Sequence, residues 1–413
     1  MPNKLDSVSQ QATALRQYFI ITANYWAFTL TDGALRMLVV LYFHQLNYAP
    51  LEIALLFVFY EAFGVITNLL GGWLGARIGL NKTMNIGLAI QIIALAALLV
   101  PSVYLTVVWV MAAQALSGIA KDLNKMSAKS AIKSLVPGEQ SSTLFKWVAR
   151  LTGSKNALKG IGFFMGGVLL STLGFKGAVL SMAIGLSIVL LCSLVTLKSN
   201  TQSKQATKPK FSEVFSKSSS INYLSAARLF LFGARDVWFV IALPVFLSAE
   251  LGWAHSSVGT FLATWVICYG LVQSFAPSLF SDQNQESNSH GKNAFFWAAI
   301  LAIIPFAIAL ALSTKLSPEI TLVTGLLFFG AIFAINSSLH SFLIVHFASE
   351  KNVSMDVGFY YMANAMGRLI GTVLSGLIFQ HYGLQACLIV SGAFIAMAAY
   401  FALKLDSATH AQT

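Results

Sequence analysis

Long apolar stretches separated by short polar ones recur along the whole chain. Most of them approach the roughly 20 residues that an α-helix needs to cross a bilayer. The pattern predicts twelve membrane-spanning helices, with breaks at Pro101, Pro137-Gly138, Gly174 and Gly383. The predicted spans are residues 18–44, 50–74, 83–100, 103–127, 145–172, 177–197, 221–249, 254–280, 294–313, 320–346, 355–380 and 383–403.

A polar segment divides the predicted spans six and six. Residues 198–220 are rich in Ser and Lys, as is typical of a flexible linker. Segments 46–54 (LNYAPLEIA) and 251–259 (LGWAHSSVG) align at an offset of 205 residues, and each precedes a long apolar span. Two related six-helix bundles leave such a repeat in a sequence. We therefore expect an all-α membrane protein with bundles over 1–197 and 221–413, joined by a cytoplasmic linker over 198–220.

Composition and charge agree with a membrane protein. The chain of 413 residues is 57% hydrophobic and only 10% charged. The first apolar run is long enough to span and carries charged residues, so we expect no cleaved signal peptide. If both termini are cytoplasmic, the outer loops hold only Lys176 and Lys315 among the basic residues. This bias predicts a multi-pass protein of the cytoplasmic (inner) membrane. The net charge of +11 lies largely within apolar segments, so we expect no nucleic-acid partner.

Ionisable residues inside the predicted spans are the strongest indication of function. A charge at the centre of a membrane helix costs about 2.5–3.5 kcal/mol on insertion scales, so it needs a partner or a use. Cations outnumber acids at this depth, which favours binding of a small anion. The basic residues assigned to substrate binding are Arg36, Lys121, Lys125, Lys155, Lys159, Arg228, Arg235 and Arg368. The residues assigned to coupling or gating are Asp32, Glu61, Asp122, Asp236 and Arg77.

Several of these residues also have a structural interpretation. Lys121 and Lys125 lie four residues apart, share a helix face and could simply pair with Asp122. Asp32 could neutralise Arg36 one turn away. Lys155 and Lys159 have the same four-residue spacing in the next predicted span, and we expect these two neighbouring spans to pack antiparallel.

Other basic residues are expected to act differently. Arg235 and Asp236 are adjacent, so their side chains should point in different directions rather than pair. Long basic side chains near the cytoplasmic ends of spans often reach lipid headgroups. We apply this interpretation to Lys129, Lys133, Lys146 and Arg150.

Patterns for other chemistry are weak. The cysteines fall in separate spans without paired spacing, and His340 and His346 lie six apart in one predicted helix, which favours packing roles. No phosphate-binding loop of the type G-x-x-x-x-G-K-[ST] occurs, so we expect no ATP drive within this chain. There is no nucleophile–base constellation either. We predict no enzyme activity, no cofactor and no metal site.

The segment 71–83 (GGWLGARIGLNKT) resembles the loop between helices 2 and 3 of the major facilitator superfamily. Gly72, Leu74, Arg77 and Gly79 match that motif, while Ala76 replaces its acidic residue and Leu80 its second arginine. The resemblance implies two six-helix bundles that work by alternating access. Gln114 stands where drug/proton antiporters of this superfamily carry an arginine, which speaks against drug antiport.

Three segments resemble ArsJ-type organoarsenical exporters more narrowly: residues 24–44, 114–137 and 144–164. This resemblance implies export of 1-arseno-3-phosphoglycerate, which glyceraldehyde-3-phosphate dehydrogenase makes when arsenate replaces phosphate. The ester then falls apart outside, so the cell gains arsenate resistance. It implies functional coupling to that dehydrogenase without required contact. The alternative is export or exchange of another organophosphate or organic anion. A non-transporting membrane sensor or scaffold is less favoured because the loops are short.

Overall fold

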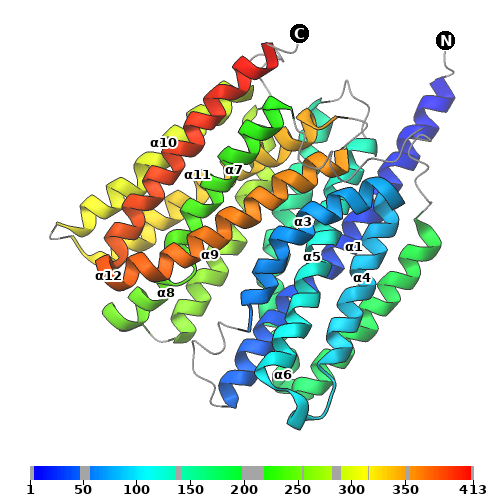
Figure 1. Cartoon of the computed structure of the whole chain (residues 1–413), viewed down its shortest axis with the longest axis horizontal. Helices are drawn as coiled ribbons and strands as arrows, with labels where there is room; N and C mark the ends of the chain where they lie inside the picture. The colour runs from blue at the N-terminus through cyan, green and yellow to red at the C-terminus, as the bar shows by residue number, and fades with distance from the viewer. Residues whose placement is uncertain are drawn as a thin grey trace.

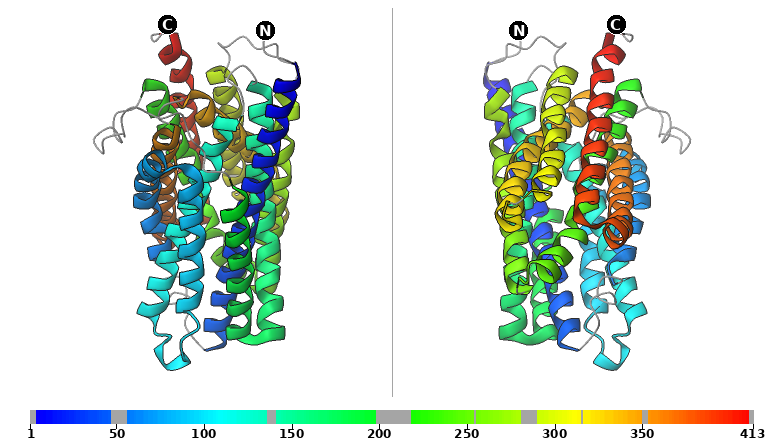
Figure 2. Two further views of the ribbon diagram at one scale, coloured as in Figure 1. Left: turned by 90° about the vertical axis from the view of Figure 1, so that its right-hand side faces the viewer. Right: turned by 90° about the vertical axis from the view of Figure 1, so that its left-hand side faces the viewer.

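The computed structural model describes residues 4–46, 56–135, 141–197, 218–253, 255–280, 290–314, 316–349 and 353–410. These residues are almost entirely helical, and none of them forms a strand. Both ends of the chain lie at the same end of the molecule, which we call the terminal face, and the long helices run between it and the opposite face (Figures 1 and 2).

The first half of the chain forms five long helices and a short 3₁₀ turn, η1 (Ser102–Tyr104). The long helices are α1 (Lys4–Gln45), α3 (Val58–Ile78), α4 (Leu80–Ala97), α5 (Val107–Leu135) and α6 (Ser141–Thr196). Gly174 interrupts α6 with a φ of 66°, a conformation that suits glycine because it has no Cβ. As a result, α6 consists of two antiparallel crossings.

The second half follows the same plan. Its long helices are α7 (Ser219–Phe239), α9 (His255–Phe275), α10 (His290–Leu312), α11 (Pro318–Phe347) and α12 (Val353–His410). Three short elements accompany them: α8 (Ala242–Val245), the π-helix η3 (Phe246–Glu250) and the 3₁₀ helix η4 (Ala276–Phe280). Gly383, with a φ of 73°, divides α12 in the same way as Gly174 divides α6.

Counted with α6 and α12 as two crossings each, the described residues form twelve long helical segments, six on either side of 198–217. The all-α fold with twelve spans is therefore confirmed, as are the breaks at Gly174 and Gly383. The helix of the fourth predicted span, 103–127, extends beyond that span, since α5 continues to Leu135. The linker residues 198–217, Pro137-Gly138 and nearly all of the repeat segment 46–54 lie outside the described residues, and the domain boundaries stay a prediction.

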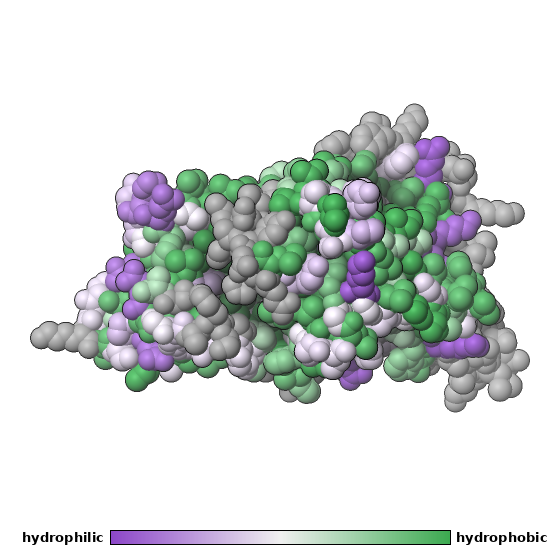
Figure 3. Space-filling view, turned by 90° about the horizontal axis from the view of Figure 1, so that it is seen from below, coloured by the Kyte–Doolittle hydropathy of each residue, from purple (hydrophilic) through white to green (hydrophobic). Residues whose placement is uncertain are grey.

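The outer surface suits a bilayer. Seven helices of the described chain are long and apolar enough to cross a membrane, α6 and α12 among them. Neither α5 nor α7 is in this group, and both carry several charged residues. Large apolar side chains such as Val108, Ile303 and Leu310 are exposed on the surface. On the face opposite the termini, hydrophilic side chains form separate patches among hydrophobic ones (Figure 3).

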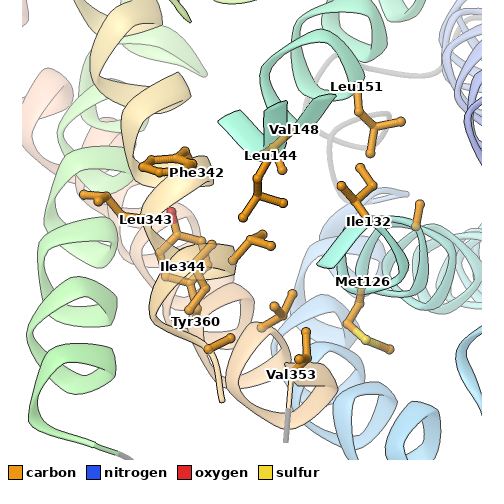
Figure 4. Packing of buried hydrophobic residues seen from close by; sticks show 14 of the residues in the cluster. Met126, Ile132, Leu144, Val148, Leu151, Phe342, Leu343, Ile344, Val353 and Tyr360 are labelled. Carbon is orange, nitrogen blue, oxygen red and sulfur yellow. The ribbon is translucent and has the colours of Figure 1, made fainter. Parts of the chain in front are cut away.

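Three hydrophobic cores hold the molecule together. One core is built only from helices α1 to α6 and a second only from α7 to α12. The third combines residues of both halves and lies towards the terminal face, where Ile132 and Leu144 pack near Phe342 and Val353 (Figure 4). The two halves are thus closed against each other at the terminal face.

Glycines bring α3 and α12 close together in this closed interface. A Cβ added to Gly72 of α3 would lie 2.7 Å from the backbone oxygen of Ser354 in α12. A Cβ on Gly358 would lie 2.7 Å from the backbone oxygen of Asn68. The Ser354 hydroxyl donates a hydrogen bond to the Gly72 carbonyl. The missing side chain of Gly72, a residue of the loop motif, therefore allows α3 of the first half to contact α12 of the second closely.

Candidate substrate site

Glu61 of α3 lies between cations that come from both halves. Arg36 Nη2 of α1 lies 3.0 Å from Glu61 Oε1, and Arg368 Nη2 of α12 lies 2.9 Å from the same oxygen. Lys121 Nζ of α5 is 3.9 Å from Glu61 Oε2. These four side chains are only 16–27% exposed. Three helices of one half and one of the other therefore meet at a single carboxylate.

Asp236 of α7 extends this network within the second half. Arg368 Nε donates to Asp236 Oδ2 at 3.0 Å, and Arg235 pairs with Asp236 Oδ1 at 2.5 Å. The expectation that Arg235 and Asp236 do not pair is therefore wrong. The Asp236 side chain is fully buried and short, whereas the long arginine side chain folds back along the helix to reach it. Arg235 and Arg368 thus share one carboxylate.

Asp122 of α5 compensates two lysines on its own helix. Lys125 Nζ lies 2.5 Å from Asp122 Oδ1, three residues apart on one face, and Lys121 Nζ lies 3.7 Å from Oδ2. The structural interpretation, pairing with Asp122, therefore describes both lysines in this conformation.

Asp32 and Arg36 do not neutralise each other in the structure. The Tyr60 hydroxyl donates to Asp32 Oδ1 at 2.7 Å, and Arg36 instead pairs with Glu61. The same Tyr60 ring lies beneath two cations, with Arg36 Cζ 4.0 Å and Lys121 Nζ 3.8 Å from its centroid. Tyr60 was missed in the sequence, where nothing distinguishes it from the many interfacial aromatic residues.

Lys155 and Lys159 of α6 are the least compensated residues of the predicted set. Neither makes an ion pair with any described residue, and both are partly exposed. Lys159 Nζ lies 5.9 Å from the centroid of the Phe163 ring. A Cβ added to Gly33 of α1, next to Asp32, would lie 2.8 Å from the Lys159 carbonyl oxygen, so Lys159 belongs to the same region as the Glu61 network.

The expected packing of α6 along α5 is wrong, because α6 packs mainly on α1 and α9. Glycines explain this choice. A Cβ on Gly162 would lie 2.6 Å from the Leu30 carbonyl oxygen, and one on Gly166 would lie 2.4 Å from that of Ala34. The backbones of α6 and α1 can therefore approach closely, and Lys155 and Lys159 face the region between the halves from a different side than the lysines of α5.

Arg228 of α7 is held by neutral groups. Its Nε donates to Asn364 Oδ1 at 2.9 Å and its Nη1 to Ser337 Oγ at 3.3 Å, and the residue is 3% exposed. Gln273 Nε2 also donates to Ser337 Oγ, at 3.1 Å, and Asn156 of α6 donates to Gln273 Oε1 at 2.7 Å. A chain of hydrogen bonds thus leads from α6 in the first half to Arg228 in the second.

Lys129 is buried, so the headgroup interpretation is wrong for it, whereas Lys133 is partly exposed and still contacts the other half. Lys129 is 2% exposed and donates to the Tyr361 hydroxyl and, at 3.5 Å, to Ser341 Oγ. Lys133 donates to the His346 carbonyl oxygen at 3.1 Å. Their contacts lie across the interface because α5 continues past its predicted end. Four-residue spacing from Lys121 to Lys133 was the signal that could have shown this.

The remaining predictions concern the edges of the site. Lys146 and Arg150 are exposed, as expected. Arg77, at the end of α3, lies over the Trp73 ring at 5.1 Å, and no carboxylate among the described residues pairs with it. Gly79, with a φ of 97°, lies between the end of α3 and the start of α4. His340 is fully buried in α11.

Comparisons with known proteins agree with this architecture. The family model of the Major Facilitator Superfamily matches residues 18–243 and 224–413. No curated protein sequence matches the chain. Among solved structures, the chain is similar to a bacterial homologue of the iron transporter ferroportin in an outward-facing state, at TM-score 0.73 and 14% identity over 95% of this chain and 99% of that one.

Two further structures show the same fold. The proton:xylose symporter XylE gives a TM-score of 0.71 at 14% identity, over 97% of this chain and 100% of that one. The fucose:proton symporter FucP of E. coli gives 0.71 at 13% identity, over 94% and 98%. The family match spans nearly the whole chain, and the helices and charged interface fit it. The protein is a multi-pass membrane transporter and belongs to the major facilitator superfamily.

Proposed function

We propose that this transporter exports a small polyvalent organic anion, 1-arseno-3-phosphoglycerate, and thereby confers arsenate resistance. The observation that carries this proposal is the charge of the interface between the halves. The eight predicted basic side chains and Lys129 lie there with four of the predicted acids, Asp32, Glu61, Asp122 and Asp236, nine positive charges against four negative ones. Of these cations, Lys129, Lys155, Lys159 and Arg228 make no ion pair with a described residue.

The chemistry of the cargo fits these donors. A phosphate ester carries about −1.5 to −2 charges at neutral pH, and an arsenate ester at the other end adds comparable charge. Ammonium and guanidinium groups are suitable donors for such oxyanions. Trivalent arsenic would instead need clustered thiolates, whereas the three cysteines lie on three different helices, α6, α9 and α12. The segments that resemble organoarsenical exporters lie on α1, α5 and α6, which carry many of these cations.

We propose alternating access of residues 1–197 against 221–413, with 198–220 as a cytoplasmic linker, in the cytoplasmic membrane with both termini inside. The terminal face is then the cytoplasmic face. An anion entering between the halves competes with Glu61 for Arg36 and Arg368, and this competition loosens the one carboxylate that links α1, α3 and α12. A glyceraldehyde-3-phosphate dehydrogenase supplies the ester, without required contact.

Transport into inverted vesicles tests the substrate. Arsenate, 3-phosphoglycerate and enzymatically made 1-arseno-3-phosphoglycerate are compared side by side, with vesicles lacking the protein as control. We expect accumulation of the arseno-ester and little of arsenate. Preferred transport of 3-phosphoglycerate would instead favour the alternative, an organophosphate exporter. Uptake of none of the three would leave the anion proposal without support.

A further inference from the structure

The residues that face each other between the halves form two layers at different depths. The deep layer consists of Lys121 on α5, Arg235 on α7 and Arg368 on α12. The terminal layer consists of Lys129, Arg228 and Tyr361 on the same three helices. On each helix the two residues are seven or eight positions apart, about 10–12 Å along the axis, and so lie on a similar side of it. The terminal layer is the one nearer the terminal face.

Among the described residues, carboxylates pair with cations of the deep layer but not of the terminal layer. Glu61 and Asp122 both pair with Lys121, and Asp236 pairs with Arg235 and Arg368. In the terminal layer Lys129 has neutral hydrogen-bond partners, the hydroxyls of Tyr361 and Ser341.

The electrostatic surroundings of Lys129 are positive. Lys125 Nζ lies over the same Tyr361 ring as Lys129 Nζ, at 4.6 and 5.0 Å from its centroid, and none of the described carboxylates pairs with Lys129. Arg228 in turn binds only neutral groups among the described residues, and Ser337, which accepts from it, lies one turn from Ser341 on α11. A buried ammonium without a counter-charge destabilises the closed interface.

We propose that the terminal layer is a separate subsite for a tetrahedral oxyanion, the phosphate end of the cargo, and that Lys129 is its principal cation. Lys129 lies in the first half and Tyr361 in the second, so separation of the halves at the terminal face breaks their contact and frees the ammonium. An anion entering from this face meets Lys129 and Arg228 first, with the hydroxyls of Tyr361, Ser337 and Ser341 as further donors. It then passes to the deep layer.

This inference rests on the proposed anion transport, and kinetics measured separately from each face test it. The protein is reconstituted with a C-terminal tag that reports which face is outside. With 1-arseno-3-phosphoglycerate supplied at the terminal face, Lys129→Gln should raise KM about tenfold and change kcat little, because a charged contact made on entry is lost. KM measured from the opposite face should stay within about twofold of wild type. Lys129→Arg should retain most of the affinity.

Lys146→Gln is the matched control, since Lys146 also lies towards the terminal face, near the start of α6, but is exposed. An unchanged terminal-face KM in Lys129→Gln, with wild-type transport intact, would overturn the subsite and leave the proposed function standing. A second measurement does not depend on transport: inorganic phosphate should raise the unfolding temperature of wild type and Lys146→Gln but not of Lys129→Gln. If the wild-type protein transports none of the anions, the proposed function fails. If phosphate raises the unfolding temperature of wild type, Lys146→Gln and Lys129→Gln equally, the subsite is overturned.

Discussion

At the scale of single residues, Lys155 and Lys159 stand apart because their side chains make neither an ion pair nor a hydrogen bond with any described residue, whereas Lys129 and Arg228 have neutral hydrogen-bond partners. We predict that Lys155→Gln or Lys159→Gln reduces anion transport by about a hundredfold, as expected when a charged contact to the cargo is lost. Arginine at either position should be less harmful, since it keeps the charge but changes its geometry. Vesicle uptake, corrected for the amount of protein in the membrane, measures this, and wild-type rates in both glutamine variants would contradict it.

Lys121 differs from these two lysines because Glu61 and Asp122 already lie 3.9 and 3.7 Å from its ammonium. The excess positive charge near these spans was evident in the sequence. Which lysines are balanced was not, since Glu61 reaches Lys121 and Arg368 only after three helices have packed together. The ion pair between the adjacent residues Arg235 and Asp236 likewise depends on side-chain conformations, which a helical wheel does not show.

Tyr60 permits a second test at this scale. Tyr60→Phe keeps the ring beneath Arg36 but removes the hydroxyl that donates to buried Asp32. We predict a loss of about 1–3 kcal/mol in stability, the usual effect of leaving a buried acceptor without its donor. Thermal unfolding of the purified protein measures it. Tyr42→Phe is the control, because that ring stacks on Phe175 and its hydroxyl makes no hydrogen bond with a described residue. Equal unfolding temperatures of the two variants would refute the role of the hydroxyl.

At the scale of helices, the contact between α3 and α12 depends on the absence of side chains. We predict that Gly72→Leu lowers transport by about tenfold or more. A Cβ would already lie 2.7 Å from the Ser354 carbonyl oxygen, so a leucine side chain forces the backbones of α3 and α12 apart. Gly72→Ala should be intermediate. The matched control is Gly185→Leu, where nothing lies within 4 Å of the added Cβ. The prediction fails if both leucine variants transport alike.

Helix positions were largely predictable because hydrophobic length and glycine breaks are local properties. Gly174 and Gly383 marked the two turns, and each predicted span overlaps one helical segment. The end of α5 was not predictable from hydropathy, since Lys129 and Lys133 look like residues outside the membrane until α11 and α12 cover them. The partners of α6 were also missed, because they follow from backbone approach at Gly162 and Gly166 rather than from sequence order.

At the scale of the whole molecule, the source of energy is open to a direct test. Export of an anion from a cell that is negative inside is favourable by about 2.3 kcal/mol per charge per 100 mV. We therefore predict full export in vesicles that have a membrane potential but no pH gradient, retained in Asp32→Asn. Loss of export without a pH gradient would instead indicate obligatory proton exchange.

Cellular resistance provides a test of the complete proposal. If the cargo is the arseno-ester, the transporter should protect cells from arsenate only when a dehydrogenase makes that ester, and it should give no protection from arsenite. Growth of a sensitive strain carrying either gene alone or both together measures this. Protection from arsenite by this chain alone would contradict the assignment of cargo.

The lysines of α5 also bear on how the protein is made. A helix with Lys121, Asp122, Lys125 and Lys129 in succession is a poor candidate for partition into lipid on its own, since each central charge opposes release from the translocon by about 2.5–3.5 kcal/mol. Its partners Glu61 and Tyr60 lie on α3, which leaves the ribosome earlier, whereas Tyr361 is made more than two hundred residues later. During synthesis α5 must therefore stay beside α3 and wait for the second half, so that biosynthesis of this membrane protein ends as one cooperative assembly rather than as twelve independent insertions.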